Sequence, residues 1–102
     1  MIENCLTLIG HVVKTPKLST TPAGLHHCQF SIEHRSIQTE DGLNRQAFVR
    51  MQVVATGDWS RNLASELTEG VQISVSGFIN RHESRNGNPI LVLHAQQIEM
   101  IN

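Results

Sequence analysis

Alternation of apolar and polar residues with a period of two dominates this 102-residue chain and restricts it to a fold built from β-strands. In residues 47–55 and 71–79 the odd positions are mostly apolar and most even positions are polar. Successive side chains of a strand point to opposite faces, so each run presents one face to a core and the other to solvent. Similar or continuous apolar runs at 3–13, 27–38 and 90–100 bring the expected strands to five.

Two of the three phenylalanines break this alternation. Phe48 and Phe78 occupy positions that the pattern assigns to the polar face. Bases of single-stranded nucleic acid are natural partners for such rings, because stacking of one base on an aromatic side chain contributes roughly 1–3 kcal/mol. The alternative is that either ring packs under a loop or in a dimer interface.

Length and composition predict one domain over residues 1–102, with 39% hydrophobic and 17% charged residues. No apolar run approaches the ~20 residues that span a bilayer, so we expect no membrane association. The N-terminal residues lack the basic and apolar stretches of an export signal, which predicts a cytoplasmic location. In that reducing compartment Cys5 and Cys28 are expected to be free, buried thiols.

The charge balance argues against strong nonspecific attraction to a polyanion. Eight Lys and Arg residues face nine Asp and Glu residues, giving a net charge of -1. Binding to nucleic acid then requires that the cations be grouped in space. Such binding should be weak and sensitive to salt.

The connections between the strands carry distinct signals. Residues 14–24, with two prolines and a terminal glycine, predict a long loop. Asp41-Gly42 predicts a hairpin, and Gly10 within the first strand predicts a bulge or a close approach of backbones. Asp58 is expected to cap a short helix whose apolar face packs on the core. The apolar residues of this helix are Trp59, Leu63, Ala64 and Leu67. The predicted fold is all-β: a five-stranded Greek-key OB-fold barrel with a short helix between strands three and four.

Neither metal binding nor catalysis is expected. His26, His27 and Cys28 are adjacent, but the chain lacks the paired spacing of zinc ligands. His27 and Cys28 are strand neighbours whose side chains point to opposite faces, so they cannot act as a base and a nucleophile. We therefore predict no catalytic residue, no metal and no cofactor.

Beyond these patterns, six short motifs occur in order across nearly the whole chain. They are His27-Cys28-Gln29-Phe30, Glu33-His34-Arg35-Ser36, Arg45-Gln46-Ala47, Gly77-Phe78-Ile79, Asn86-Gly87 and Leu93-His94-Ala95-Gln96-Gln97-Ile98-Glu99. With these motifs the chain resembles primosomal replication protein N, the PriB family, which is related to bacterial single-stranded DNA-binding proteins. The resemblance implies an OB-fold homodimer that binds single-stranded DNA and engages the PriA helicase and, in some bacteria, DnaT during replication restart.

The resemblance also assigns roles to individual residues. Arg35 and Phe78 match family positions on the DNA face, and Phe48 stands where the family can carry tryptophan. Arg85 matches a basic position in the loop between the last two strands. Glu83 in that loop and Pro89 at its end stand where lysines are expected, which argues against tight DNA binding.

The remaining candidates follow from strand alternation and from the OB-fold. Arg50 should project from the same outward surface as Arg35, whose alternative partner is Glu33 in a weak surface pair. Four further cations bracket the two loops that frame the binding groove of an OB-fold, although scattered surface cations often serve solubility alone. The candidate DNA-binding residues are Lys14, Lys17, Arg35, Phe48, Arg50, Phe78, Arg81 and Arg85.

Two functions remain open on the sequence. The first is a dimeric module that holds single-stranded DNA weakly while it engages the PriA helicase. The second is a protein-interaction adaptor of the primosome whose DNA contact is incidental, which the near-neutral charge favours. The first strand, with apolar residues on both faces, is the expected dimer edge.

Overall fold

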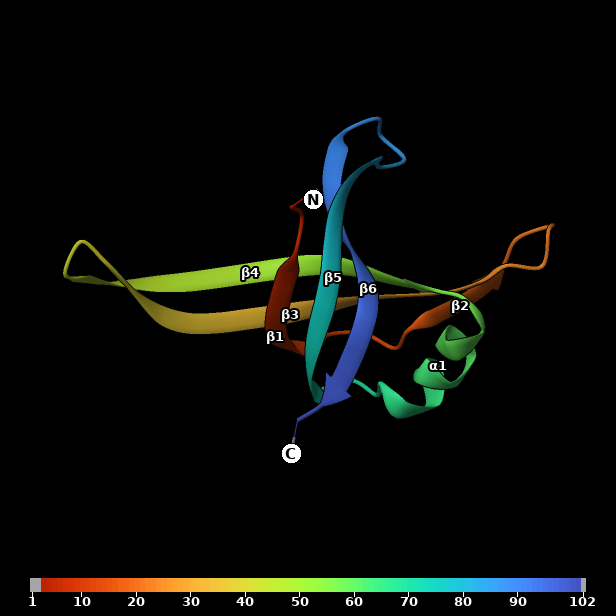
Figure 1. Cartoon of the computed structure of the whole chain (residues 1–102), viewed down its shortest axis with the longest axis horizontal. Coiled ribbons are helices and arrows are strands. Elements are labelled where there is room, and N and C mark those ends of the chain that lie inside the picture. Colours follow the sequence, from red (N-terminus) through yellow and green to blue (C-terminus); the bar gives the residue numbers. More distant parts are fainter. Residues whose placement is uncertain (1–2, 102) are drawn as a thin grey trace.

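The computed structural model describes residues 3–101, which form a mostly β structure with one short helical segment (Figure 1). A single six-stranded sheet has the order β1-β5-β6-β4-β3-β2. No helix within these residues is both long and apolar enough to cross a membrane. The strands are β1 (Leu6–Val12), β2 (Lys17–Thr20), β3 (His26–Glu40), β4 (Leu43–Thr56), β5 (Gln72–Glu83) and β6 (Pro89–Met100).

The sheet curls back on itself. β3 and β4 form a long antiparallel hairpin that β1, β5 and β6 cross (Figure 1). β1 pairs along β5 and also meets β3, with His11 opposite Glu33 and Val12 opposite Ile32. β5 and β6 form a second antiparallel hairpin. Because β4 pairs with β6 in parallel, the two hairpins belong to one sheet. The outer end of the β3–β4 hairpin projects beyond the crossing strands (Figure 1).

The predicted hairpin is confirmed, with a tighter turn than expected. Asp41 and Gly42 have φ angles of 51° and 74°, and Glu40 pairs directly with Leu43. Positive φ at both central residues matches the right-handed twist of the flanking strands, and Asp-Gly adopts it at low cost. Both strands therefore extend to the turn itself, farther than the alternating pattern predicts.

A strand inside the expected 14–24 loop was missed. β2 pairs with β3, Lys17 opposite Gln29 and Thr20 opposite His26. All four β2 side chains are exposed, so no alternation of buried and polar residues marks this edge strand. Its ladder with β3 is a long-range feature that a local pattern does not reveal.

The helical connection differs from the prediction at its start. The expected cap at Asp58 is wrong, because Gly57 precedes a 3-10 helix (Asp58–Asn62) that leads into α1 (Leu63–Glu66). Leu63 and Leu67 pack in the core as expected. Trp59 does not: its side chain is 39% exposed, and its Nε1–H donates to the Thr56 carbonyl oxygen at 2.9 Å.

The core lies between the curled strands, where inward-facing residues alternate with outward-facing ones. The β5–β6 ladder shifts register between Ser76 and Gly77, because β6 has one extra residue there, Gln96, which leaves Ser76 opposite Gln97 and Gly77 opposite Ala95. At Gly77 a Cβ would lie 1.8 Å from the carbonyl oxygen of His94. The largest fully buried hydrophobic side chains of the core are Val12, Cys28, Ile32, Val53, Leu67, Ile73, Val75 and Leu93.

The two free cysteines lie in opposite environments, which corrects the expectation that both are buried. Cys28 is fully buried and Cys5 is exposed. Burial raises the pKa of the Cys28 thiol. Because the thiolate is the reactive form, a disulfide reagent at neutral pH should modify Cys5 at least ~100-fold faster than Cys28.

A thiol titration of the native protein checks this prediction, with Cys5→Ser as the control that removes the fast phase. Urea should expose the second thiol. Equal rates for both thiols in the native protein would contradict the burial of Cys28.

Candidate nucleic-acid interface

One outward surface of the sheet collects most of the predicted residues, and we call it the outer face. It comprises the odd-numbered residues of β3, the even-numbered residues of β4 and β5, and the even-numbered residues of β6 up to His94, before the register of β6 shifts. Cross-strand partners share a face of a sheet. Pairing therefore links Arg35 to Phe48 and Glu33 to Arg50 across β3 and β4. It also links Val54 on β4 to His94 on β6.

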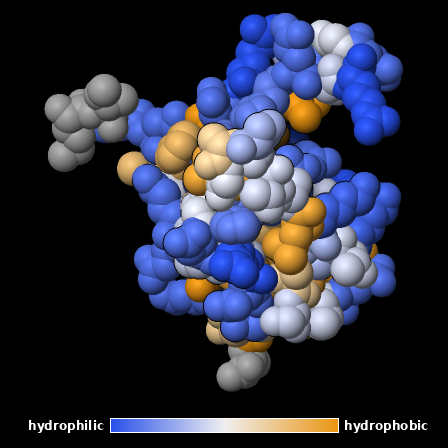
Figure 2. Space-filling view, turned by 90° about the vertical axis from the view of Figure 1, so that its right-hand side faces the viewer, coloured by the Kyte–Doolittle hydropathy of each residue, from blue (hydrophilic) through white to orange (hydrophobic). Residues whose placement is uncertain are grey.

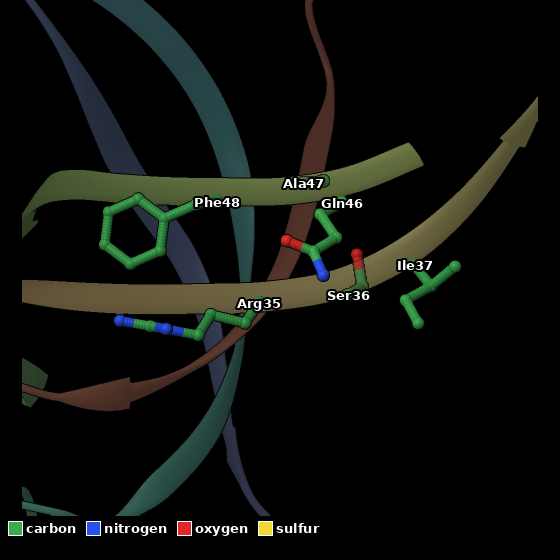
Figure 3. Close-up of a pocket in the computed structure, with 6 residues that line it drawn as sticks. All are labelled: Arg35, Ser36, Ile37, Gln46, Ala47 and Phe48. Carbon is green, nitrogen blue, oxygen red and sulfur yellow. The ribbon is translucent and has the colours of Figure 1, made fainter. Parts of the chain in front are cut away.

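Arg35 and Phe48 form the first cluster of the outer face. The Phe48 side chain is 54% exposed, and the Arg35 Cζ lies 4.6 Å from the centre of its ring. Figure 3 shows Arg35 reaching from β3 toward the ring that projects from β4, in a shallow hollow that Gln46 also lines. The open ring and the guanidinium beside it offer a base a stacking surface and a phosphate a cation.

The alternative pairing of Arg35 with Glu33 is not what the structure shows. Glu33 lies instead with its Oε1 3.6 Å from Nε2 of His11. Arg50 stands opposite Glu33 in the ladder and is exposed. The guanidinium of Arg35 therefore packs on an aromatic ring rather than on an acid.

Three of the candidate cations meet in a second part of the outer face. Lys14, Lys17 and Arg50 line one hollow, together with Gln29 and Gln52. The lysines come from the start of the connection after β1 and from β2, the strand that was missed. β2 therefore brings the long connection against the outer face. The two lysines and Arg50 form a local group of positive charge, which a protein of nearly neutral net charge needs in order to bind a polyanion.

A cluster of three aromatic rings forms the third part. The rings of Phe78 and His94 are stacked and nearly parallel, 4.9 Å apart between centroids, and the His82 ring meets the His94 ring edge to edge, 5.1 Å between centroids. Phe78 is partly buried beneath its neighbours. His82 and His94 line a hollow shared with Gln52 and His27. Gln52 lines both this hollow and the one with the lysines, so the two hollows adjoin.

His94 has a perturbed titration. Burial lowers its pKa below the ordinary value of 6.5, and the nearby imidazoles of His82 and His27 lower it further. His94 is therefore mostly neutral at pH 7. A neutral imidazole stacked on Phe78 behaves as one more aromatic ring of the surface.

The two phenylalanines, both expected on the polar face of the sheet, do not lie side by side. Phe78 is level with His94 in the ladder, and His94 is level with Val54. Phe48 lies six residues before Val54 on the same strand, a separation of about 20 Å at the usual rise of a strand. The rings are separate positions along one outer face.

The last two candidates lie apart from these clusters. Arg81 is opposite Leu91 near the outer end of β5, and Arg85 is in the turn that leads to β6. This hairpin projects at the top of Figure 1, and Figure 2 shows it as a largely hydrophilic extension. Arg81 has the opposite alternation to His82, so it does not share the outer face.

Sequence reasoning did not place His82 and His94 among the candidate DNA-binding residues. The signal that could have found them is alternation, since His82 and His94 have the same even numbering as Phe78. Within residues 3–101, no group of three or more His, Cys, Asp or Glu side chains is placed to hold a metal ion.

Comparisons with known proteins identify the family of this chain. Residues 4–97 match a family described as "Another single-strand binding protein family". The chain is 51% identical over 102 residues to the replication restart protein PriB of Photorhabdus laumondii, covering 100% of this chain and 97% of that protein. The PriB of Serratia proteamaculans is 48% identical with the same coverage. The chain belongs to the PriB family. Both PriB relatives are named replication restart proteins, and the match with this chain covers 97% of each of them.

Solved structures show that the fold extends beyond PriB. A PriB structure from Ralstonia solanacearum superposes with a TM-score of 0.81 at 20% identity, covering 99% of this chain and 100% of that one. A Plasmodium falciparum SSB in complex with ssDNA superposes with a TM-score of 0.80 at 15% identity, covering 100% of this chain and 97% of that one. A single-stranded DNA-binding protein variant from Thermus aquaticus superposes with a TM-score of 0.82 at 21% identity, covering 98% of this chain and 51% of that one. PriB and these single-stranded DNA-binding proteins share one fold.

Proposed function

We propose that this PriB family member binds single-stranded DNA along its outer face and stimulates the PriA helicase during replication restart. The observation that carries the proposal is the exposed Phe48 ring with Arg35 packed against it. An exposed aromatic ring beside a guanidinium suits a base and its phosphate, whichever the base. The adjoining group of Lys14, Lys17 and Arg50 extends the path for the DNA backbone.

The assembly that we propose is a homodimer of Greek-key OB barrels, each built from the five strands β1, β3, β4, β5 and β6, with β2 added at an edge and the helix between β4 and β5. β1 supports the choice of dimer edge. It pairs with β3 only at His11 and Val12, and Ile9 is 45% exposed on it. An unpaired strand edge with apolar side chains is suited to pairing with its twin. Sedimentation equilibrium tests the dimer.

The proposed role is that of a binding protein and not of an enzyme. The relatives are named for replication restart and for single-stranded DNA binding. We further propose a cytoplasmic location, where replication restart takes place in bacteria, with DnaT as an additional partner.

Substitutions at the first cluster test the proposal. Arg35→Ala and Phe48→Ala should each weaken binding of a fluorescein-labelled oligothymidylate about tenfold, because each removes a contact worth on the order of 1–2 kcal/mol. The double variant should lose less affinity for DNA than the product of the two single fold-losses, because the two side chains touch and act together. Fluorescence anisotropy titrations at fixed salt measure all three affinities.

Ile37→Ala is the matched control. Ile37 lines the same hollow, is 69% exposed and offers no aromatic ring or charge. Its affinity should equal that of the unchanged protein. Unaltered affinity in both Arg35→Ala and Phe48→Ala would argue that DNA does not use this cluster.

A second function is favoured by the acidic Glu83 in the hollow with His82, and by the net charge of -1. Both oppose a polyanion and suit an adaptor that recognises a partner protein. A PriA unwinding assay with the double variant separates the two functions. Stimulation that survives the loss of DNA affinity supports the adaptor, and stimulation that falls with DNA affinity supports the DNA-binding function.

A further inference from the structure

The pair of His82 and His94 has a geometry that depends on a proton. Their Nε2 atoms are 2.9 Å apart, which is hydrogen-bonding distance. A single proton between the two atoms makes this contact favourable, whereas two would place N–H groups against each other and none would oppose two lone pairs. The pair can therefore be neutral as a whole or hold one added proton on an outer nitrogen, but it resists a second.

The groups around the pair come from every neighbouring strand. β6 supplies His94 itself, and β5 supplies Phe78 in the stack, His82 and the carboxylate of Glu83. From β3 the titratable group is His27, whose Nδ1 is 3.1 Å from the Thr56 hydroxyl of β4. Within the described residues that line this hollow, the other groups are uncharged: Gln29, Gln52, Val53, Val54, Thr56, Ile90 and Val92.

We propose that His82 and His94 are phosphate-contacting residues of the outer face and that the pair takes up one proton when the DNA strand binds beside it. The proposal rests on the DNA binding proposed above and deepens it. The pair adjoins the hollow of Lys14, Lys17 and Arg50, so a strand that follows these cations reaches the imidazoles next. A phosphate there favours the charged form of the pair. Protonation also places a cation against the Phe78 ring.

The sign of the pH dependence follows. Without DNA the lowered pKa of His94 keeps its imidazole uncharged at neutral pH, so His94 then offers no positive charge to a phosphate. A bound phosphate raises the pKa of the pair, and binding then takes up a proton. Affinity for DNA should rise as the pH falls from the raised pKa toward the lowered one, and should level off outside that window. One linked proton allows at most about tenfold per pH unit.

The experiment compares oligothymidylate affinity between about pH 8 and about pH 5.5, the range in which histidine titrates, at fixed ionic strength with EDTA present. The unchanged protein should bind about fivefold to tenfold more tightly at the acidic end. His82→Gln and His94→Gln should abolish most of this gain. His26→Gln is the matched control. On β3 the odd-numbered residues form the outer face, so His26 points away from that face, and its side chain hydrogen-bonds to Thr20. This variant should keep the full pH dependence.

A second measurement does not depend on variants that fold. NMR titration of the imidazole signals of the unchanged protein should show the His94 pKa moving upward when oligothymidylate is added. A pKa of His94 that DNA leaves in place, or a pH dependence that survives in the His82→Gln, His94→Gln double variant, overturns the proposal. Tight DNA binding without pH dependence would contradict proton uptake by the pair but not the proposed DNA binding. Absence of DNA binding at every pH would contradict both.

Discussion

Gly77→Ala should destabilise the protein by about 3 kcal/mol or more, the largest effect that we expect from adding a single methyl group. A Cβ at this position would lie 1.8 Å from the carbonyl oxygen of His94 and 2.9 Å from its carbonyl carbon. Both atoms belong to the backbone of β6, so no side chain can rotate away to make room. Relief requires β5 and β6 to separate at the bulge, which breaks backbone hydrogen bonds of the central sheet.

Urea denaturation measures this loss as a lower midpoint at an unchanged slope. Ser76→Ala is the matched control on the other side of the bulge. It removes one hydroxyl contact, to Thr7 Oγ1 at 2.9 Å, and should cost no more than about 1 kcal/mol. A Gly77→Ala protein with the midpoint of the unchanged chain would show that β5 and β6 do not approach each other as closely as described.

Features of the fold that depend on neighbouring residues were predictable from the sequence. Asp41-Gly42 specifies its turn through the φ angles that these two residues accept. Gly10 was expected to mark a bulge or a close approach, and a close approach is confirmed: a Cβ there would lie 2.5 Å from the Glu33 carbonyl oxygen. The same reasoning was not applied to Gly77, whose contact is closer still.

Features that depend on register were not predictable. β2 has no buried side chain of its own and is a strand only because it pairs with β3. The contact of His82 with His94 depends on the alignment of β5 with β6, which shifts at the bulge. Alternation alone places both imidazoles on the outer face but leaves their distance unknown. The candidate site was thus predictable as a set of residues on one surface, and its division into clusters was not.

That division leads to the second large effect. Phe48→Ala combined with Phe78→Ala should weaken binding of a long oligothymidylate by about 100-fold or more, because each ring contributes roughly 1–3 kcal/mol through stacking. The rings belong to separate clusters about 20 Å apart along the outer face, so their contributions should add. Arg35 and Phe48 touch, so their contributions should not add.

Oligonucleotide length distinguishes addition from a shared stacking site. A strand long enough to reach both clusters should show the full product of the two single effects in anisotropy titrations. A strand of about three nucleotides cannot span 20 Å at the ~6 Å per nucleotide of an extended backbone, so it should respond to only one ring at a time. If the double variant binds the long strand no more weakly than Phe48→Ala alone, the path of DNA does not include Phe78. The strand would then leave the outer face before it reaches the His82 and His94 pair, and the proton uptake inferred for that pair would lose its cause.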